Sequence, residues 1–172
     1  MTIKSAALAI VLLSASVASA AETSLDPKAG TVFSPERAKD LIGQCSRDVP
    51  RNVTGTWQPT SDQITDLELR LLAALKAAWP AHAQSNSMSS PTYDHHFVRQ
   101  YGGLVLNGRK IIYVNAFPSS VVDFDGSNVS PAVNVDWRSV AIRVCDGGNR
   151  FWGAEYDPAT KKFDHFAFNG AV

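Results

Sequence analysis

Residues 60–80, TSDQITDLELRLLAALKAAWP, constrain the fold of this chain more than any other stretch. Thr60 and Gln63 have the spacing of a capping box, and Pro80 ends the pattern because proline cannot continue a helix. The sequence therefore predicts one long amphipathic helix, which must lie on an apolar surface. Its apolar side chains recur at helical intervals: Ile64, Leu67, Leu71, Leu75 and Ala78.

Strand patterns follow this helix along the chain. Asn107-Gly108 stands between two runs rich in β-forming residues, which is the strongest short-range signal for a β-hairpin. A two-residue turn places Leu106 opposite Arg109 and assigns the side chains to two faces. One face collects Val98, Leu104, Leu106, Ile111, Tyr113 and Phe117, and the other collects Phe97, Arg99, Tyr101, Val105, Ile112 and Val114.

Three further strands are predicted at Trp137–Cys145, Arg150–Tyr156 and Lys162–Phe168. Gly147-Gly148 would connect the first two, and the turn Asp157-Pro158-Ala159-Thr160 the last two. Helices first and strands afterwards, with short connections, indicate an α+β fold. We expect an antiparallel sheet of about five strands, a hairpin plus a three-stranded meander, packed by the long helix and a short N-terminal helix.

The short N-terminal helix is predicted from Ser34, its N-cap, to the stop at Gly43. Residues 21–31 are polar and aperiodic, so we expect a flexible leader there. Proline, asparagine and glycine make residues 47–59 a predicted loop. With a signal peptide at residues 1–20, residues 32–172 are expected to form a single α+β domain.

The first residues have the pattern of a secretory signal peptide. Lys4 precedes an apolar run from Ala6 to Leu13, and Ala18-Ser19-Ala20 offers small residues at both positions that a signal peptidase reads. We expect cleavage near Ala20 and a periplasmic or secreted protein of bacterial origin. No later segment approaches the roughly 20 apolar residues of a membrane-spanning helix, so no membrane span is expected.

The charge balance argues against nucleic acid as a partner. The chain has 16 basic and 16 acidic residues, and removal of Lys4 with the signal leaves 15 basic residues against 16 acidic ones. A nucleic-acid binder needs a basic surface to neutralise phosphates. The expected partner is therefore a protein or a ligand of the cell envelope.

The chain has two cysteines, Cys45 and Cys145. In an oxidising compartment such a pair is most simply a disulfide, which would close a loop of about 100 residues and stabilise the fold by roughly 4–5 kcal/mol. The alternative, a reactive Cys145, would leave Cys45 as an unexplained thiol. We therefore predict the disulfide.

The predicted Gly147-Gly148 turn sets a register for the last strands. Val140, Ile142, Val144 and Phe151 then share an apolar face, which we expect to be the core beneath the helix. The opposite face is aromatic and cationic, and such faces suit recognition. Alternatively, the N-terminal helix and loop cover that face. The candidate binding residues are Tyr101, Arg143, Asp146, Arg150, Trp152, Tyr156, Phe163 and His165, with the hairpin tip Asp146–Arg150 or the loop Asp123–Asn128 as the contact.

No metal or cofactor is predicted. Adjacent His95 and His96 on a strand point to opposite faces, so they do not chelate one ion together. The loop Asp123–Asn128 resembles a calcium loop but lacks its bidentate glutamate, which favours a surface turn. No phosphate-binding, dinucleotide or nucleophile motif is present in the sequence.

An exported α+β domain with one sheet, one covering helix and a cysteine at a hairpin tip is similar in plan to some periplasmic lysozyme inhibitors. The sequence holds no inhibitory loop motif, and a shared plan does not define function.

Our first hypothesis is a binding or inhibitory module of the bacterial cell envelope, with no catalytic residues. One rival is a small hydrolase with His96 or His165 as general base and Asp94, Asp146 or Asp164 as its carboxylate. Another is a structural envelope protein that self-associates through a sheet edge.

Overall fold

The computed structural model describes residues 30–79, 97–122 and 135–170. Several predictions lie outside these residues: the signal peptide, most of the leader, Asp94, the histidine pair His95 and His96, and the loop Asp123–Asn128.

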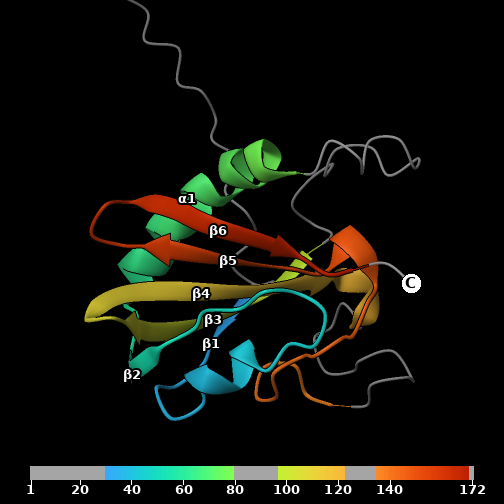
Figure 1. The fold of residues 1–172 in the computed structure, drawn as a ribbon, viewed down its shortest axis with the longest axis horizontal. Helices are drawn as coiled ribbons and strands as arrows, with labels where there is room; N and C mark the ends of the chain where they lie inside the picture. The colour runs from blue at the N-terminus through green and yellow to red at the C-terminus, as the bar shows by residue number, and fades with distance from the viewer. Residues whose placement is uncertain (1–29, 80–96, 123–134, 171–172) are drawn as a thin grey trace, which may run out of the picture.

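A single mixed sheet forms the centre of the fold (Figure 1). Its strand order is β1-β3-β4-β5-β6, and β2 pairs with the same edge of β3 as β1 does. The β1–β3 pair is parallel and the other pairs are antiparallel, so the predicted α+β class is confirmed, whereas the sheet, predicted to be antiparallel, is mostly so. Six strands lie in the described residues: β1 (Gly30–Val32), β2 (Val53–Trp57), β3 (Phe97–Leu106), β4 (Arg109–Pro118), β5 (Trp152–Asp157) and β6 (Lys162–Phe168).

The predicted long helix is α1 (Ser61–Ala78). Its capping box is present: the backbone N–H of Thr60 donates to Gln63 Oε1 at 2.9 Å, and the backbone N–H of Gln63 donates to Thr60 Oγ1 at 3.3 Å. Within the described ranges, no helix has the length and apolar character needed to cross a bilayer. The helix packs on one face of the sheet through a cluster that includes Leu67, Leu71, Leu75, Tyr101, Ile112, Val114, Trp152, Ala154 and Tyr156.

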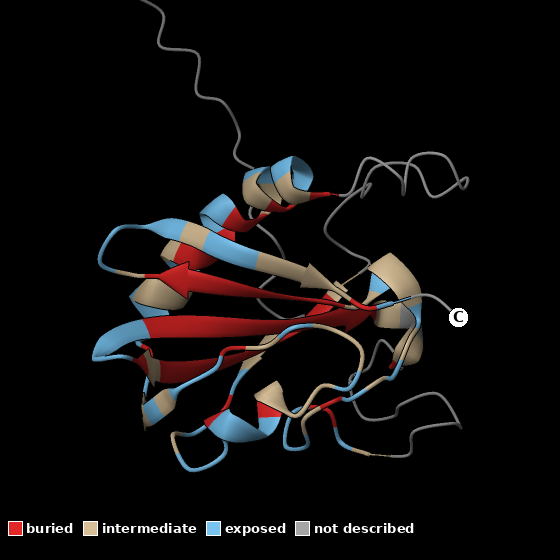
Figure 2. Ribbon diagram, in the orientation of Figure 1, coloured by how far each residue is buried: buried red, intermediate tan, exposed pale blue. Residues whose placement is uncertain are grey.

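The β3–β4 hairpin has the predicted register. Leu106 pairs with Arg109, and both turn residues are left-handed, with φ of 50° at Asn107 and 81° at Gly108. The side chains divide between the two faces as the alternation predicts, because a strand points successive residues to opposite sides. Figure 2 shows that the central strands β3, β4 and β5 are buried along most of their length, whereas β6 is more exposed.

Two segments of chain cover the sheet face opposite α1. The first includes the 3₁₀ helix η2 (Ala38–Ile42), where the sequence predicts the short N-terminal helix, and it buries Ala38 and Leu41. The second, residues 135–151, buries Trp137 and Ile142 against Val98 and Phe117. The sheet is therefore sandwiched between the helix and irregular chain.

The strand predicted at Trp137–Cys145 is wrong, since these residues form a turn, bends and coil. Their backbone groups are satisfied by amide side chains of the sheet and not by a neighbouring strand. Gln100 Nε2 donates to the carbonyls of Trp137 and Val140 at 2.5 and 2.8 Å, and Asn115 Nδ2 donates to the carbonyl of Ile142 at 2.9 Å. Sequence alternation carries no sign of such side-chain partners.

The predicted Gly147-Gly148 hairpin is also wrong. Asp146, Gly147 and Gly148 are all left-handed, and the 3₁₀ helix η5 (Gly148–Arg150) leads into β5, which pairs directly with β4. Another 3₁₀ helix, η4 (Ser119–Val121), follows β4. Because the predicted partner strand is absent, the predicted faces are reversed: α1 covers Trp152 and Tyr156, whereas Ile142, Val144 and Phe151 lie in the opposite cluster.

Two short strands were missed. β1 begins at Gly30 in the predicted leader, and β2 lies within the predicted loop. Trp57 anchors β2, since its indole N–H is shared between the carbonyls of Leu104 and Ile111, both at 3.1 Å. Strands of three and five residues give too little alternation to be recognised from sequence.

Candidate functional site

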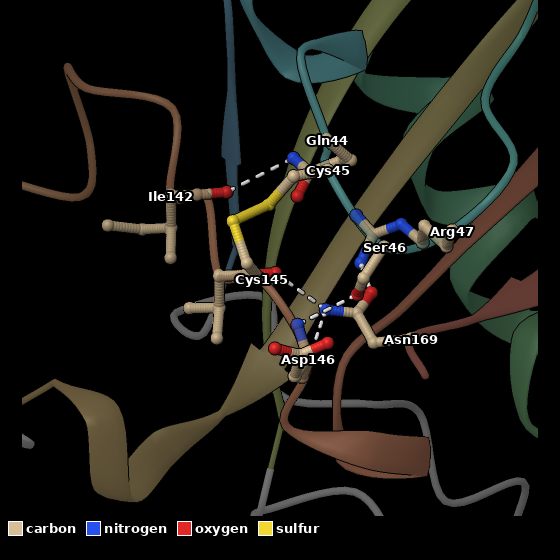
Figure 3. The surroundings of a disulfide bond; sticks show 9 residues. Gln44, Cys45, Ser46, Arg47, Ile142, Cys145, Asp146 and Asn169 are labelled. Atoms are coloured by element: carbon tan, nitrogen blue, oxygen red, sulfur yellow. Dashed lines mark hydrogen bonds between the residues drawn. A yellow bond between two sulfur atoms is a disulfide. The ribbon is translucent and has the colours of Figure 1, made fainter. Parts of the chain in front are cut away.

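The predicted disulfide between Cys45 and Cys145 is present, with an S–S distance of 1.98 Å and a Cα–Cα distance of 5.2 Å. Figure 3 shows that it joins two loops at a crowded junction. The backbone N–H of Asp146 donates to Ser46 Oγ at 2.9 Å, and Asn169 Nδ2 donates to the carbonyls of Val144 and Asp146, both at 2.7 Å. The reactive-thiol reading is excluded, because both sulfurs are bonded.

Residues Asp146–Arg150, the predicted hairpin tip, form a compact bend held at this junction. Gly147 has a φ of 82°, and a side chain there would bring its Cβ within 2.6 Å of the Phe151 ring, so glycine is required. The backbone N–H of Gly148 donates to the carbonyl of Gly170 at 2.9 Å. Asp146 is half-buried and Arg150 exposed.

The aromatic candidates lie beneath the helix and not on a free face. Tyr101, Trp152 and Tyr156 are 2%, 1% and 0% exposed, and Phe163 is half-buried against the same cluster. This face is therefore covered, but by α1 and not by the N-terminal helix and loop that were the predicted alternative. Arg143, predicted to stack on Trp152, instead lies against Gly43 and is exposed.

Two polar contacts attach α1 to this aromatic face. Glu68 and Arg99 form a buried ion pair, with Arg99 Nη2 3.1 Å from Glu68 Oε2, and the Tyr101 hydroxyl donates to Glu68 Oε1. The Tyr156 hydroxyl donates to Asp66 Oδ2. Hydrogen bonds from Arg70 and then Tyr156 lower the pKa of Asp66 to about 2. These residues are engaged in holding the helix to the sheet.

A solvent-open groove of about 640 Å³ lies on the other face of the sheet. Its walls are the loop at residues 48–51, the end of the β3–β4 hairpin, and strands β5 and β6. The side chains that line it are mostly polar: Asp48, Val49, Pro50, Arg51, Leu106, Asn107, Arg109, Glu155 and His165. In Figure 1, the segment between η2 and β2 runs across the front of the sheet and supplies the loop.

His165 reaches the groove through a β-bulge. The β5–β6 pairing shifts by one residue between Gly153 and Glu155, and His165 has a left-handed φ of 53°. Tyr156 pairs with Phe163 across the β5–β6 loop, but the bulge then turns His165 to the opposite face from Phe163. Bulges commonly re-aim a side chain next to a functional site.

Of the two carboxylates that line this groove, Glu155 is much the less exposed. It is 8% exposed and has no side-chain hydrogen bond in the described part of the chain, but its oxygens are not among the fully buried atoms that lack a partner. The nearest opposing group is His165, whose Nδ1 lies 3.9 Å from Glu155 Oε1. Burial raises the pKa of Glu155 above the ordinary glutamate value, whereas His165 and Arg109 act in the opposite direction. A carboxyl with a raised pKa in a groove is a candidate functional group.

The two arginines of the groove already face carboxylates. Arg51 Nη2 lies 3.3 Å from Asp48 Oδ1, and Arg109 Nη1 lies 3.4 Å from Asp157 Oδ2. Arg109 is also 3.8 Å from Asp164 Oδ2. No group of three or more histidine, cysteine, aspartate or glutamate side chains among the described residues could hold a metal ion.

Of the eight predicted binding residues, His165 alone lines this groove. Sequence reasoning missed Glu155 and Arg109. In a strand, Trp152 and Tyr156 point to one face and Glu155 points to the other. A carboxylate opposite two aromatic side chains could therefore have been recognised from the sequence as a candidate site residue. Comparison with models of protein families, with curated proteins and with solved structures finds no match to this chain.

Proposed function

We propose that this chain is an exported binding module of the bacterial cell envelope, and that its contact surface is the groove around Glu155. The observation that carries the proposal is the carboxylate of Glu155 on a central strand, a residue that is 8% exposed and whose one ion pair among the described residues is with His165, at 3.9 Å. Burial of a carboxylate with so little compensation costs folding free energy, and a ligand that supplies a closer counter-charge would offset that cost.

Rigid walls support this proposal. Arg47, next to the loop at residues 48–51, donates from Nη1 to Asn169 Oδ1 at 2.8 Å, from Nε to the Tyr113 hydroxyl at 3.3 Å, and from Nη2 to Asn115 Oδ1. The disulfide holds the same loop two residues earlier. A preorganised surface loses little conformational entropy on binding. Export is supported by the disulfide together with the expected signal peptide.

Chemical-shift mapping tests this proposal. The purified protein is titrated with amines, carboxylates, sugars and small peptides, and backbone amide shifts are followed by NMR. We expect shifts to concentrate at residues 48–51, 106–109, Glu155 and His165. Ligands that shift other regions while leaving all of these unchanged would place the binding surface elsewhere.

A second candidate is a hydrolase that uses Glu155 and His165 for acid–base chemistry. The specific observation is their 3.9 Å separation in one groove, which a bound substrate or water could shorten. Glu155 takes the place of the aspartates expected from the sequence. In an assay of ester, amide, glycoside and phosphoester substrates, hydrolysis by the parent chain that is lost in both Glu155→Gln and His165→Asn would support an enzyme. Equal rates in parent and variants would remove this candidate.

A further inference from the structure

We propose that the groove binds an organic cation, a primary ammonium or guanidinium group at the end of an alkyl chain, through the carboxylate of Glu155. This inference rests on the proposed function and specifies its ligand chemistry.

The charges of the groove favour a cation over an anion. Arg51 and Arg109 are each within 3.4 Å of an aspartate, so an anionic ligand would have to compete with carboxylates already in place. Counting Asp157 and Asp164 with the lining residues, four carboxylates face two guanidinium groups. With His165 neutral, the groove therefore has two negative charges in excess.

Glu155 is the carboxylate without an arginine at ion-pair distance among the described residues, although Arg109 acts on it from farther away. Asp48 faces Arg51, and both Asp157 and Asp164 lie within 4 Å of Arg109. Glu155 has His165 at 3.9 Å, which is charged only when protonated. Because Glu155 is largely removed from water, its attraction for a cation is stronger than that of an exposed carboxylate.

The apolar part of the groove suits an alkyl chain. Val49, Pro50 and Leu106 line it beside the charged groups. A lysine or arginine side chain buries its methylene groups along such a surface while its charged end reaches a carboxylate. The same chemistry is found in free diamines, and the experiment distinguishes these two sources.

NMR titration tests the inference with defined probes. The probes are the blocked peptides acetyl-Gly-Lys-Gly-amide and acetyl-Gly-Arg-Gly-amide, the uncharged analogue with norleucine, 1,4-diaminobutane and calcium chloride. We expect the lysine or arginine peptide, or the diamine, to shift the amides of residues 106–109 and Glu155, and the norleucine peptide to bind more weakly by about tenfold or more. Whichever binds more tightly, the peptide or the diamine, identifies the source of the cation.

Two variants connect this binding to Glu155. Glu155→Gln keeps the shape of the side chain and removes its charge. It should weaken the binding of the cationic probe by about tenfold or more. Asp62→Asn is the matched control: it removes one negative charge from the exposed first turn of α1, on the other side of the sheet, and should leave binding unchanged. Thermal unfolding of each variant verifies that it is folded.

Four results would overturn the inference. Equal binding of lysine and norleucine peptides would show that the groove binds ligands without using the charge, which leaves the proposed function standing. Equal weakening by Asp62→Asn would indicate a nonspecific charge effect, and tighter binding of calcium than of any organic cation would assign the groove to a metal ion. If neither these probes nor the broad ligand panel shifts the backbone amides of the groove, the proposed function is overturned as well.

Discussion

The imidazole Nδ1 of His165 lies 3.9 Å from Oε1 of Glu155, although the two residues are on different strands and His165 stands at a β-bulge. Without the bulge, His165 would share the face of Phe163 beneath α1. The irregularity in β6 therefore places a titratable side chain beside a buried carboxylate in the groove.

Replacement of Glu155 by glutamine should stabilise the protein at pH 7, by roughly 0.5–1 kcal/mol, because ionised Glu155 is buried with little compensation. Burial raises its pKa in the folded state. Proton binding to Glu155 therefore favours the folded state below the unfolded glutamate pKa, and this contribution is lost as the pH rises through the higher folded value. The advantage of the variant should disappear on acidification. Urea unfolding between pH 3 and pH 8 measures this difference.

A lower free energy of unfolding for Glu155→Gln than for the parent chain at pH 7 would contradict this expectation. It would mean that His165 and Arg109 more than compensate the burial of the charge. Asp62→Asn, with the same change in net charge, is the control.

Tyr156→Phe should lower the free energy of unfolding by about 1 kcal/mol, because it removes the hydrogen bond that joins β5 to Asp66 of α1. In a double-mutant cycle with Asp66→Asn, the combined loss should be smaller than the sum of the two single losses. Strict additivity would show that the two side chains do not interact.

The pKa of Asp66, lowered to about 2, gives a pH dependence of opposite sign to that of Glu155. The ionised form stabilises the folded state, fully so above the unfolded aspartate pKa near 3.8, and this contribution is lost as the pH falls toward 2. The stability difference between the parent chain and Asp66→Asn should therefore shrink from pH 5 to pH 2. A difference that is constant over this range would contradict the lowered pKa.

Much of the architecture could be predicted from local patterns. The capping box at Thr60, the Asn107-Gly108 turn and the pairing of two cysteines each depend on residues whose chemistry specifies one arrangement. The long helix, the hairpin register and the disulfide are correct for this reason.

The errors arise where distant side chains decide the backbone. Gln100 and Asn115 satisfy residues 137–142, so that an alternating sequence runs as coil across the sheet. The predicted binding residues were placed on the wrong face for the same reason. The strand predicted at Trp137–Cys145 is absent, and its predicted pairing had assigned the faces of β5. The sequence around His165 does not predict the β-bulge that places this side chain beside Glu155.

Gln100→Leu should destabilise the protein by about 2–3 kcal/mol, because it leaves the buried carbonyls of Trp137 and Val140 and the N–H of Ile142 without their partner. Amide hydrogen exchange should increase most at residues 137–146. Gln58→Leu, at an exposed position, is the matched control. Unchanged exchange in this segment would show that other contacts hold it.

Loss of the disulfide should cost about 4–5 kcal/mol, since it closes a loop of 100 residues. The variant Cys45→Ser/Cys145→Ser should unfold at a lower urea concentration than the parent chain. A reducing agent should lower the midpoint of the parent but not that of the variant. Equal midpoints for parent and variant would show that the junction around Ser46 and Asn169 holds the loops without the covalent bond.

The most direct test is the pKa of the Glu155 side-chain carboxyl group. It is measured from the ¹³C chemical shift of the carboxyl carbon as a function of pH, with and without acetyl-Gly-Lys-Gly-amide. A cation that binds the ionised carboxylate must lower this pKa by linkage, so we expect a raised pKa in the free protein and a lower one with the peptide. The norleucine peptide should leave the free value unchanged. A Glu155 pKa that is the same with and without saturating lysine peptide would contradict binding at this carboxylate.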